Sequence, residues 1–154
     1  MVIQIDSREK KIHRDRITSG FDFLGIGWLV SKLPFGDYMN LDNPRLVVDR
    51  KHDLAEVAAN FTQERFLKEM KNAQIYGIRI IFLVEHGRGI EKLEDVQGWE
   101  NPRLKESPMA LSGDRIFRKM IAYQNTYGVD FRFCDRGRTA LEIAQILGGD
   151  FLEG

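Results

Sequence analysis

Hydrophobic residues recur along the chain with two different periods, one typical of strands and one typical of helices. Short apolar or alternating runs predict strands at 1–6, 26–33, 78–84 and 129–134. Apolar residues three or four positions apart predict helices that begin near Asp53, Gln63, Ser112 and Thr139. A further helix is expected over the basic run at 10–16, where Ile12 is the single apolar anchor. The run at 78–84 is almost wholly apolar, which suits an interior strand covered on both faces.

A hairpin completes the pattern, because Asp42-Asn43-Pro44 is turn chemistry and the residues on both sides of it read as strand. The predicted order is strand, helix, a three-strand meander that includes the hairpin, helices, strand, helix, strand, helix. This order predicts an α/β domain with a mixed central sheet flanked by helices on both faces.

Several local expectations follow from the same pattern. Ser19-Gly20 should end the first helix, and Phe23 should then lead into the core. Trp28 should be a large core residue of the strand at 26–33. Thr139 and Glu142 have the spacing of a capping box for the last helix.

Composition narrows the class of protein. The length of 154 residues fits one domain, so residues 1–154 are expected to form a single unit. The net charge is zero, and any DNA-binding surface must therefore be a local patch. Cys134 is the only cysteine, which excludes an internal disulfide and a cysteine-based zinc site. With no membrane-length apolar run and no signal-peptide pattern, we expect an intracellular protein of the cytoplasm or nucleoid, without a membrane partner.

The predicted hairpin concentrates the candidate chemistry. Folding the chain about Asn43 brings Asp37 opposite Asp49, and like charges at about 5 Å repel each other unless a cation lies between them. Strand alternation places Lys51 on the face of Asp49 and turns Arg50 to the other face. Two carboxylates and a lysine on one face are typical of a metal-dependent phosphodiesterase.

Ordinary structural explanations exist for each part of this pattern. An Asp-Arg-Lys run at a strand end is usually a solvated edge, and Gly-Asp is a common turn dipeptide. Their spacing by one hairpin, with Asp6 at the end of the first strand, favours the site over these explanations. The basic run from Lys10 to Arg16 is either a solvated helix face or a phosphate-binding patch beside the site.

Three segments resemble the XPF-type (ERCC-four) nuclease domain. Gly36-Asp37, the short hairpin and Val48-Asp49-Arg50-Lys51 are similar to its signature of Gly-Asp, a spacer and Glu-Arg-Lys. Ile5-Asp6-Ser7-Arg8-Glu9 resembles the family's first strand, which ends in Asp-x-Arg-Glu. The resemblance covers residues 2–84, and later segments resemble the stand-alone versions encoded by phages and prophages.

The resemblance implies a restriction-endonuclease-like fold, dependence on Mg²⁺ or Mn²⁺, and cleavage of branched DNA such as flaps, forks or Holliday junctions. It also implies pairing through the nuclease domain, as a homodimer or heterodimer. The 154 residues contain no helicase domain and no tandem helix-hairpin-helix module. We therefore expect a dimer, a partner protein or the irregular loop at 87–108 to help select the DNA structure.

Two departures from the family pattern bear on the site. Asp49 stands where the family commonly has Glu, a shorter carboxylate that the wider superfamily also uses. The family has Asp four residues after the lysine, but this chain has Ala55 there, and the nearest acid is Asp53. With Glu56 three residues later, Asp53 is either a helix cap, a part of the site, or both.

The sequence thus predicts a metal-dependent, structure-specific DNA endonuclease. Asp37 and Asp49 would hold the metal, Asp6 would assist or orient, and Lys51 would position the attacking water. Arg50 would either support the metal ligands or contact a phosphate. The candidate DNA contacts are Arg8, Lys10, Lys11, Arg14 and Arg65. The alternative is a non-catalytic subunit with a nuclease fold that binds DNA or a partner nuclease.

Overall fold

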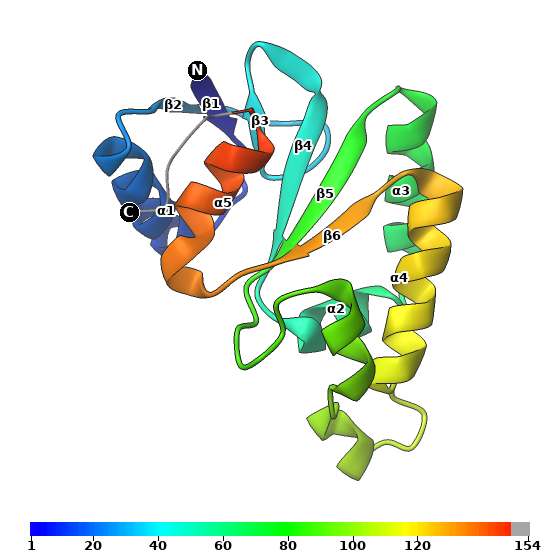
Figure 1. Cartoon of the computed structure of the whole chain (residues 1–154). Helices are drawn as coiled ribbons and strands as arrows, with labels where there is room; N and C mark the ends of the chain where they lie inside the picture. Colours follow the sequence, from blue (N-terminus) through cyan, green and yellow to red (C-terminus); the bar gives the residue numbers. More distant parts are fainter. Residues whose placement is uncertain (149–154) are drawn as a thin grey trace.

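The computed structural model describes residues 1–148, in which six strands form one mixed sheet (Figure 1). The strand order across the sheet is β2-β1-β3-β4-β5-β6. β3 is antiparallel to both of its neighbours, whereas β1–β2, β4–β5 and β5–β6 are parallel pairs. The strands are β1 (Val2–Ile5), β2 (Gly27–Val30), β3 (Tyr38–Asn40), β4 (Asn43–Lys51), β5 (Arg79–Val84) and β6 (Asp130–Phe133).

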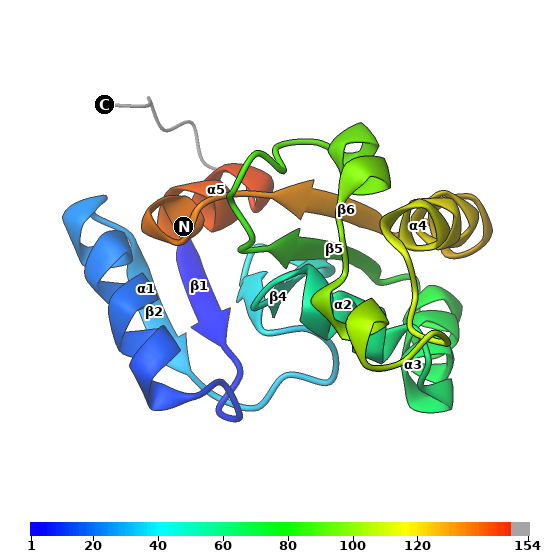
Figure 2. The ribbon, with the colours of Figure 1, turned by 90° about the horizontal axis from the view of Figure 1, so that it is seen from below.

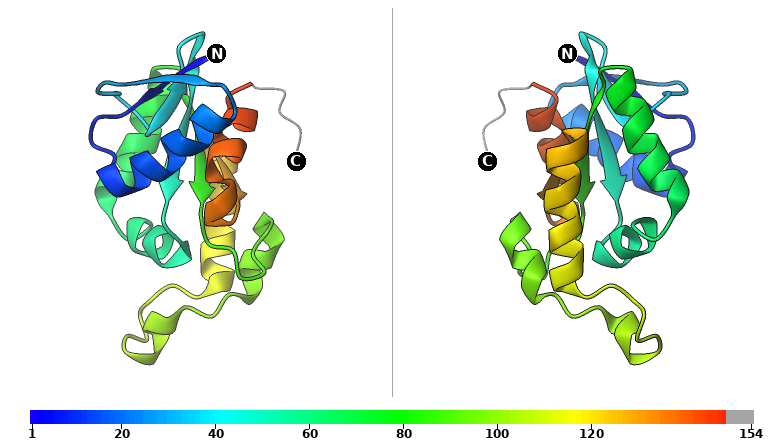
Figure 3. Two further views of the ribbon diagram at one scale, coloured as in Figure 1. Left: turned by 90° about the vertical axis from the view of Figure 1, so that its left-hand side faces the viewer. Right: turned by 90° about the vertical axis from the view of Figure 1, so that its right-hand side faces the viewer.

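Helices cover both faces of this sheet (Figures 2 and 3). One face carries α1 (Lys11–Phe23) and α5 (Thr139–Ile146), and the other carries α2 (Leu54–Asn60), α3 (Glu64–Ile75) and α4 (Gly113–Tyr127). The short 3₁₀ helices are η1 (Leu93–Gly98), η2 (Pro102–Lys105) and η3 (Arg136–Arg138). The predicted fold class, an α/β domain with a mixed central sheet between helices, is confirmed. None of the helices in residues 1–148 combines the length and the apolar character needed to cross a membrane.

Alternating residues of β4 belong to two separate cores. Val47 packs into the core beneath α2, α3 and α4, and Val48 packs into the core beneath α1 and α5. Because successive side chains of a strand point to opposite faces, Asp49 lies on the side of Val47 and Arg50 on the side of Val48. The packing of two valines thus fixes the direction of the polar residues that follow them.

The predicted three-strand meander is wrong. β2 lies at the edge of the sheet, where it pairs in parallel with β1, and it is not a neighbour of β3, the first strand of the hairpin. α1 connects β1 to β2, and a helical crossover makes the parallel pairing possible. An edge strand is covered less completely than an interior one, and Trp28 is accordingly 39% exposed, with its Nε1 donating to Asp22. Phe23, which is 91% exposed, also lies outside the core that the sequence predicted for it.

The first helix does not end at Gly20 but continues to Phe23. Gly20 is needed for packing, because a Cβ atom at this position would lie 2.4 Å from the Cβ of Ala140 on α5. The predicted capping box of the last helix is also wrong. Thr139 is the first residue of α5, and its hydroxyl donates to the carboxylate of Glu85.

We predict that Gly20→Ala lowers the free energy of unfolding by about 1–3 kcal/mol, because the added methyl group overpacks the contact between α1 and α5. Urea melting would measure the loss. Gly98→Ala is the matched control, since a Cβ there meets no heavy atom within 4 Å. Adding Ala140→Gly should restore part of the stability of the Gly20 variant. A Gly20→Ala protein as stable as the control would contradict the close contact.

Candidate active site

The β3–β4 hairpin brings the two predicted metal ligands together. Tyr38 lies opposite Val48, so one position further along the ladder Asp37 meets Asp49. The Asp37 N–H donates to the Val48 carbonyl at 2.8 Å, which extends the pairing to this position. Gly36 precedes it with φ of 72°, a conformation that favours glycine, and a Cβ there would lie 2.8 Å from the Val47 side chain. The backbone conformation and the close approach of Val47 therefore both favour glycine at position 36.

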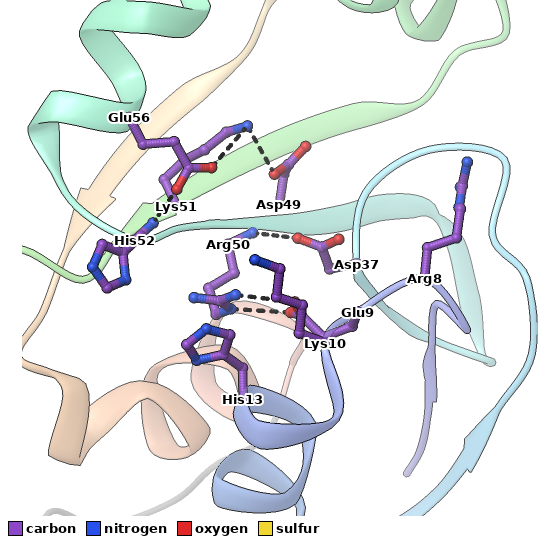
Figure 4. A pocket seen from close by; sticks show the side chains of 10 residues that line it. All are labelled: Arg8, Glu9, Lys10, His13, Asp37, Asp49, Arg50, Lys51, His52 and Glu56. Atoms are coloured by element: carbon purple, nitrogen blue, oxygen red, sulfur yellow. Dashed lines mark hydrogen bonds and ion pairs between the residues drawn. The ribbon is translucent and has the colours of Figure 1, made fainter.

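A cavity of about 650 Å³ opens beside these residues (Figure 4). Strand ends and the segment leading into α1 supply its walls. The residues that line it are Arg8, Glu9, Lys10, His13, Asp37, Asp49, Arg50, Lys51, His52 and Glu56. Four of the five residues predicted to form the catalytic site, Asp37, Asp49, Arg50 and Lys51, thus share one cavity.

Burial and neighbouring acidic groups disfavour the charged forms of Asp37 and Asp49. Burial raises the pKa of Asp37 well above its usual value, and the charges of Asp49 and Glu9 raise it further. Burial also raises the pKa of Asp49, although the nearby Lys51 ammonium acts in the opposite direction. A pair of carboxylates in this state gains free energy from a proton or a cation placed between them.

Lys51 lies on the same face as Asp49, as alternation along the strand predicted. Its Nζ is 3.4 Å from Asp49 Oδ1 and 4.0 Å from Glu56 Oε1, and it lies over the Phe66 ring. Burial acts to lower the pKa of Lys51, but Asp49 and Glu56 outweigh it and the pKa is raised. Lys51 is therefore a cation at neutral pH.

Arg50 lies on the opposite face, where its guanidinium joins two buried carboxylates. Nε and Nη2 donate to Glu9 at 3.0 Å each, and Nη1 donates to Glu85 at 2.7 Å. The Tyr38 hydroxyl donates to Glu9 at 3.1 Å, which ties β3 to the same cluster. The backbone N–H of Arg50 donates to Asp37 Oδ2 at 2.7 Å. Each guanidinium nitrogen of Arg50 thus donates to a carboxylate, which holds the side chain in place. The backbone N–H of the same residue positions Asp37.

Asp6 is not among the residues that line the cavity. It is 3% exposed, and its carboxylate accepts from Arg8 Nε at 2.8 Å and from the Leu33 N–H at 3.0 Å. The Asp6 N–H also donates to the Asp37 carbonyl at 2.8 Å. Asp6 thus anchors the segment that leads to Asp37 and does not face the cavity.

Only two of the five predicted DNA contacts line the cavity of Asp37 and Asp49. Arg8 and Lys10 line the cavity, whereas Lys11 is exposed on α1 and pairs with Asp15 at 2.9 Å. Arg14, also on α1, is not among the lining residues. Arg65 lines a separate cavity of about 220 Å³ on α3, which shares Lys51 with the larger one.

Asp53 caps α2, which confirms one of the two roles predicted for it. Its Oδ1 accepts from the Glu56 N–H at 2.9 Å, and the Glu56 carboxylate accepts from the His52 N–H at 2.8 Å. Asp53 does not line the cavity of Asp37 and Asp49. Within residues 1–148, no group of three or more His, Cys, Asp or Glu is arranged to hold a metal, so Asp37 and Asp49 form a two-carboxylate pair.

Sequence reasoning missed the roles of Glu9 and Glu85. The sequence places Glu9 in the Asp-x-Arg-Glu string without a role of its own, and it carries no prediction for Glu85. One signal was available for Glu85, because β4 and β5 are parallel and Arg50 and Glu85 stand at the same end of the sheet. A buried arginine near that edge needs a carboxylate partner.

The fold and the cavity define a class, that of an α/β domain with a mixed six-stranded sheet and with two aspartates and a lysine at the end of its β3–β4 hairpin. The structure is similar to that of XPF from Aeropyrum pernix, with a TM-score of 0.69 and 20% sequence identity. The alignment covers 96% of this chain and 63% of that one, so the chain spans less than two thirds of the archaeal protein. A structure of XPF from Aeropyrum pernix in complex with DNA aligns with a TM-score of 0.68 and 21% identity, covering 95% and 62% of the two chains. No family model and no curated protein matches the chain in sequence.

We predict that Asp53→Ala lowers the free energy of unfolding by about 1 kcal/mol, because the cap of α2 is lost. Asp53→Asn should retain most of the stability, since an asparagine oxygen accepts the same hydrogen bond. Chemical denaturation of the three proteins measures both effects. An Asn variant as unstable as the Ala variant would show that the negative charge, and not the cap, is required.

We predict that Asp37→Asn raises the melting temperature in EDTA at pH 7–8, because the ionised wild-type carboxylate is buried near Asp49 and Glu9. The pKa of Asp37 is raised in the folded state, so protonation stabilises the fold and the benefit is lost as the pH rises through that pKa. The difference between mutant and wild type should therefore shrink as the pH falls toward about 4. Asp42→Asn, in the exposed turn, is the control. A difference that grows on acidification would contradict the raised pKa.

Proposed function

We propose that this chain is a Mg²⁺- or Mn²⁺-dependent endonuclease that hydrolyses phosphodiester bonds in branched DNA. The observation that carries the proposal is the register of the hairpin, which sets Asp37 beside Asp49 and aims Lys51 into the same cavity. A structural domain would gain stability by separating these two carboxylates. Their retention in an open cavity is explained if they bind a cation.

The carboxylate pair fits a hard divalent metal. Mg²⁺ prefers oxygen ligands and is usually held by one or two carboxylates, with water and substrate phosphate completing its coordination. Burial is the largest cause of the raised pKa values of Asp37 and Asp49, and a divalent ion bound between them would offset the cost of holding both carboxylates ionised. Asp37 and Asp49 would hold the ion, which when bound would lower the pKa of a water nucleophile and offset phosphate charge.

The other residues have supporting roles in this proposal. Lys51 is cationic at neutral pH, so it would orient water and attract the phosphate, and it would not act as the base. Arg50 would hold one oxygen of Asp37 through its backbone N–H and leave the other oxygen for the metal. Arg8 and Lys10, at the cavity wall, would contact the DNA backbone.

The branched substrate rests on the resemblance to the XPF-type family, and the similar archaeal protein has been seen in complex with DNA. Flaps, forks and four-way junctions all present single strands or mobile duplex ends that an open cavity admits. Pairing with a second chain remains a prediction of the same resemblance. Cleavage-site mapping on a panel of these DNAs would distinguish the substrates.

We predict that Asp49→Asn abolishes cleavage of a labelled flap or four-way junction, with a loss of at least about a hundredfold, because a charged ligand of the metal is removed. Binding of the same DNA should persist or tighten, since a negative charge near the phosphates is gone. Cleavage in Mn²⁺, cleavage in EDTA and binding by fluorescence anisotropy are measured on the same preparations. Asp42→Asn, which changes an exposed aspartate of the same hairpin, should cleave like the wild type.

Two outcomes would contradict the proposal. Cleavage retained in Asp49→Asn would remove this aspartate from the site. A wild-type protein that binds branched DNA in Mg²⁺ and Mn²⁺ but never cleaves it would favour the alternative, a non-catalytic subunit with a nuclease fold. Melting temperatures of all variants separate these outcomes from a loss of folded protein.

A further inference from the structure

A second cavity, of about 330 Å³, adjoins the candidate active site at the ends of β4, β5 and β6. Its lining residues are His52, Asp53, Glu85, His86, Arg88 and Arg136. His52 lines both cavities, so the two adjoin at this side chain. Figure 4 shows His52 among the residues that line the first cavity. A ligand that fills the first cavity and is longer than a single phosphate group would extend into the second.

The position of the second cavity is one at which α/β proteins commonly bind ligands. β4, β5 and β6 are parallel, and they end at Lys51, Val84 and Phe133. Each strand is followed within three residues by a residue that lines this cavity. Ligands of α/β sheets bind in the crevice outside the carboxyl ends of the strands.

The positive charges of this cavity lack carboxylate partners. Arg136 Nη2 lies 2.6 Å from His52 Nε2, and Arg88 contacts the His86 carbonyl at 3.2 Å and the His86 Nδ1 at 3.3 Å. Within residues 1–148, neither guanidinium forms an ion pair with a carboxylate. An anion placed between them would supply the missing negative charge.

The two carboxylates at this cavity are already engaged. Glu85 accepts from Arg50 at 2.7 Å, from Arg16 at 2.8 Å and from the Thr139 hydroxyl. Asp53 holds the N-terminus of α2. Glu85 is thus paired with Arg50 and Arg16, whereas the second oxygen of Asp53, Oδ2, lies 3.9 Å from His52 Nε2, and neither carboxylate pairs with Arg88 or Arg136 among the described residues.

The loop that carries Arg88 is held in an unusual conformation. Arg88 has φ of 53° and is the only non-glycine residue with positive φ in residues 1–148, and Gly87 and Gly89 on either side also have positive φ. A Cβ at Gly87 would lie 2.3 Å from Asp135 Oδ1, so the loop approaches the segment that carries Arg136. Strained residues of this kind are retained where their neighbours fix them, and they concentrate at binding sites.

We propose that Arg88 and Arg136 bind a backbone phosphate of the DNA strand whose neighbouring linkage lies at Asp37 and Asp49. The strand would then pass from the first cavity over His52 and across the ends of β5 and β6. This inference rests on the proposed nuclease function. It adds a direction for the strand, and it assigns DNA contacts to residues far in sequence from the basic run at 10–16.

The test compares Arg88→Gln, Arg136→Gln and the double variant with Arg45→Gln. Arg45 is an exposed arginine near the opposite end of β4 and serves as the matched control. Binding of fluorescein-labelled single-stranded and flap DNA is measured by anisotropy in EDTA, over a series of salt concentrations. Each cavity variant should bind about tenfold more weakly than the control. The slope of log K against log salt is negative, and its magnitude should decrease by about 0.7–0.9 for each phosphate that the variant no longer neutralises.

A second measurement locates the phosphate. Methylphosphonate linkages, which are uncharged, replace one phosphate at a time along the strand. The wild-type protein should bind more weakly when the methylphosphonate replaces one particular linkage, to one side of the cleavage position. Arg136→Gln already lacks the contact with that phosphate, so the same replacement should weaken its binding very little. Equal sensitivity of Arg136→Gln and Arg45→Gln at every linkage would overturn the inference.

Failure of this inference and failure of the proposed function give different results. If the wild type binds DNA without cleaving it in Mn²⁺, the nuclease function fails, but the anisotropy and methylphosphonate results still decide whether Arg88 and Arg136 contact the strand. If the wild type cleaves and both arginine variants bind and cleave like Arg45→Gln, the nuclease function stands and the phosphate contact is rejected. Unchanged melting temperatures ensure that either result describes folded protein.

Discussion

The buried guanidinium of Arg50 is the interaction on which the arrangement of the candidate site depends. A buried charge costs several kcal/mol unless it is paired and fully hydrogen-bonded. Here it is shared by Glu9 and Glu85, whose side chains are 6% and 0% exposed. Glu9 precedes α1, and Glu85 follows β5. The Glu85 carboxylate also accepts from Arg16 on α1 and from Thr139 on α5. The cluster therefore fixes the end of β4 against most of the elements on one face of the sheet.

Fixing one face of β4 also fixes the other. Arg50 and Lys51 are neighbours in the chain, so the anchoring of Arg50 on one side determines where Lys51 and Asp49 stand on the opposite side. The same residue reaches across the hairpin through its backbone N–H to Asp37. The end of one strand thus links the paired charges of Arg50, Glu9 and Glu85 to the aspartates on its other face, and Arg50 and Glu9 also line the cavity.

The parts of the structure that were predictable from the sequence are those set by local rules. Strand alternation depends only on neighbouring residues, and it placed Lys51 on the face of Asp49. The pairing of Asp37 with Asp49 was also predicted, but the turn lies at Leu41-Asp42 and not about Asn43, and a register shift between Met39 and Asn40 is what sets Asp37 opposite Asp49. The amphipathic helices α2 and α3, with Val57 and Phe66 buried, follow from periodicity in the same way. The position of β2, the exposure of Trp28 and the partners of Arg50 depend on contacts between distant segments. Gly20 illustrates the limit, since its lack of a side chain signalled a helix end but serves a contact with Ala140, 120 positions away in the sequence.

The uncompensated carboxylates have a thermodynamic consequence that does not require knowledge of any substrate. A folded domain that holds Asp37 and Asp49 side by side is less stable than the same fold without their repulsion, and this deficit is recovered by whatever positive species binds between them. Because the unfolded chain separates the two residues, such binding favours the folded state by mass action. If a cation binds between the two aspartates, the free energy of unfolding of this protein will therefore depend on the identity and concentration of that cation.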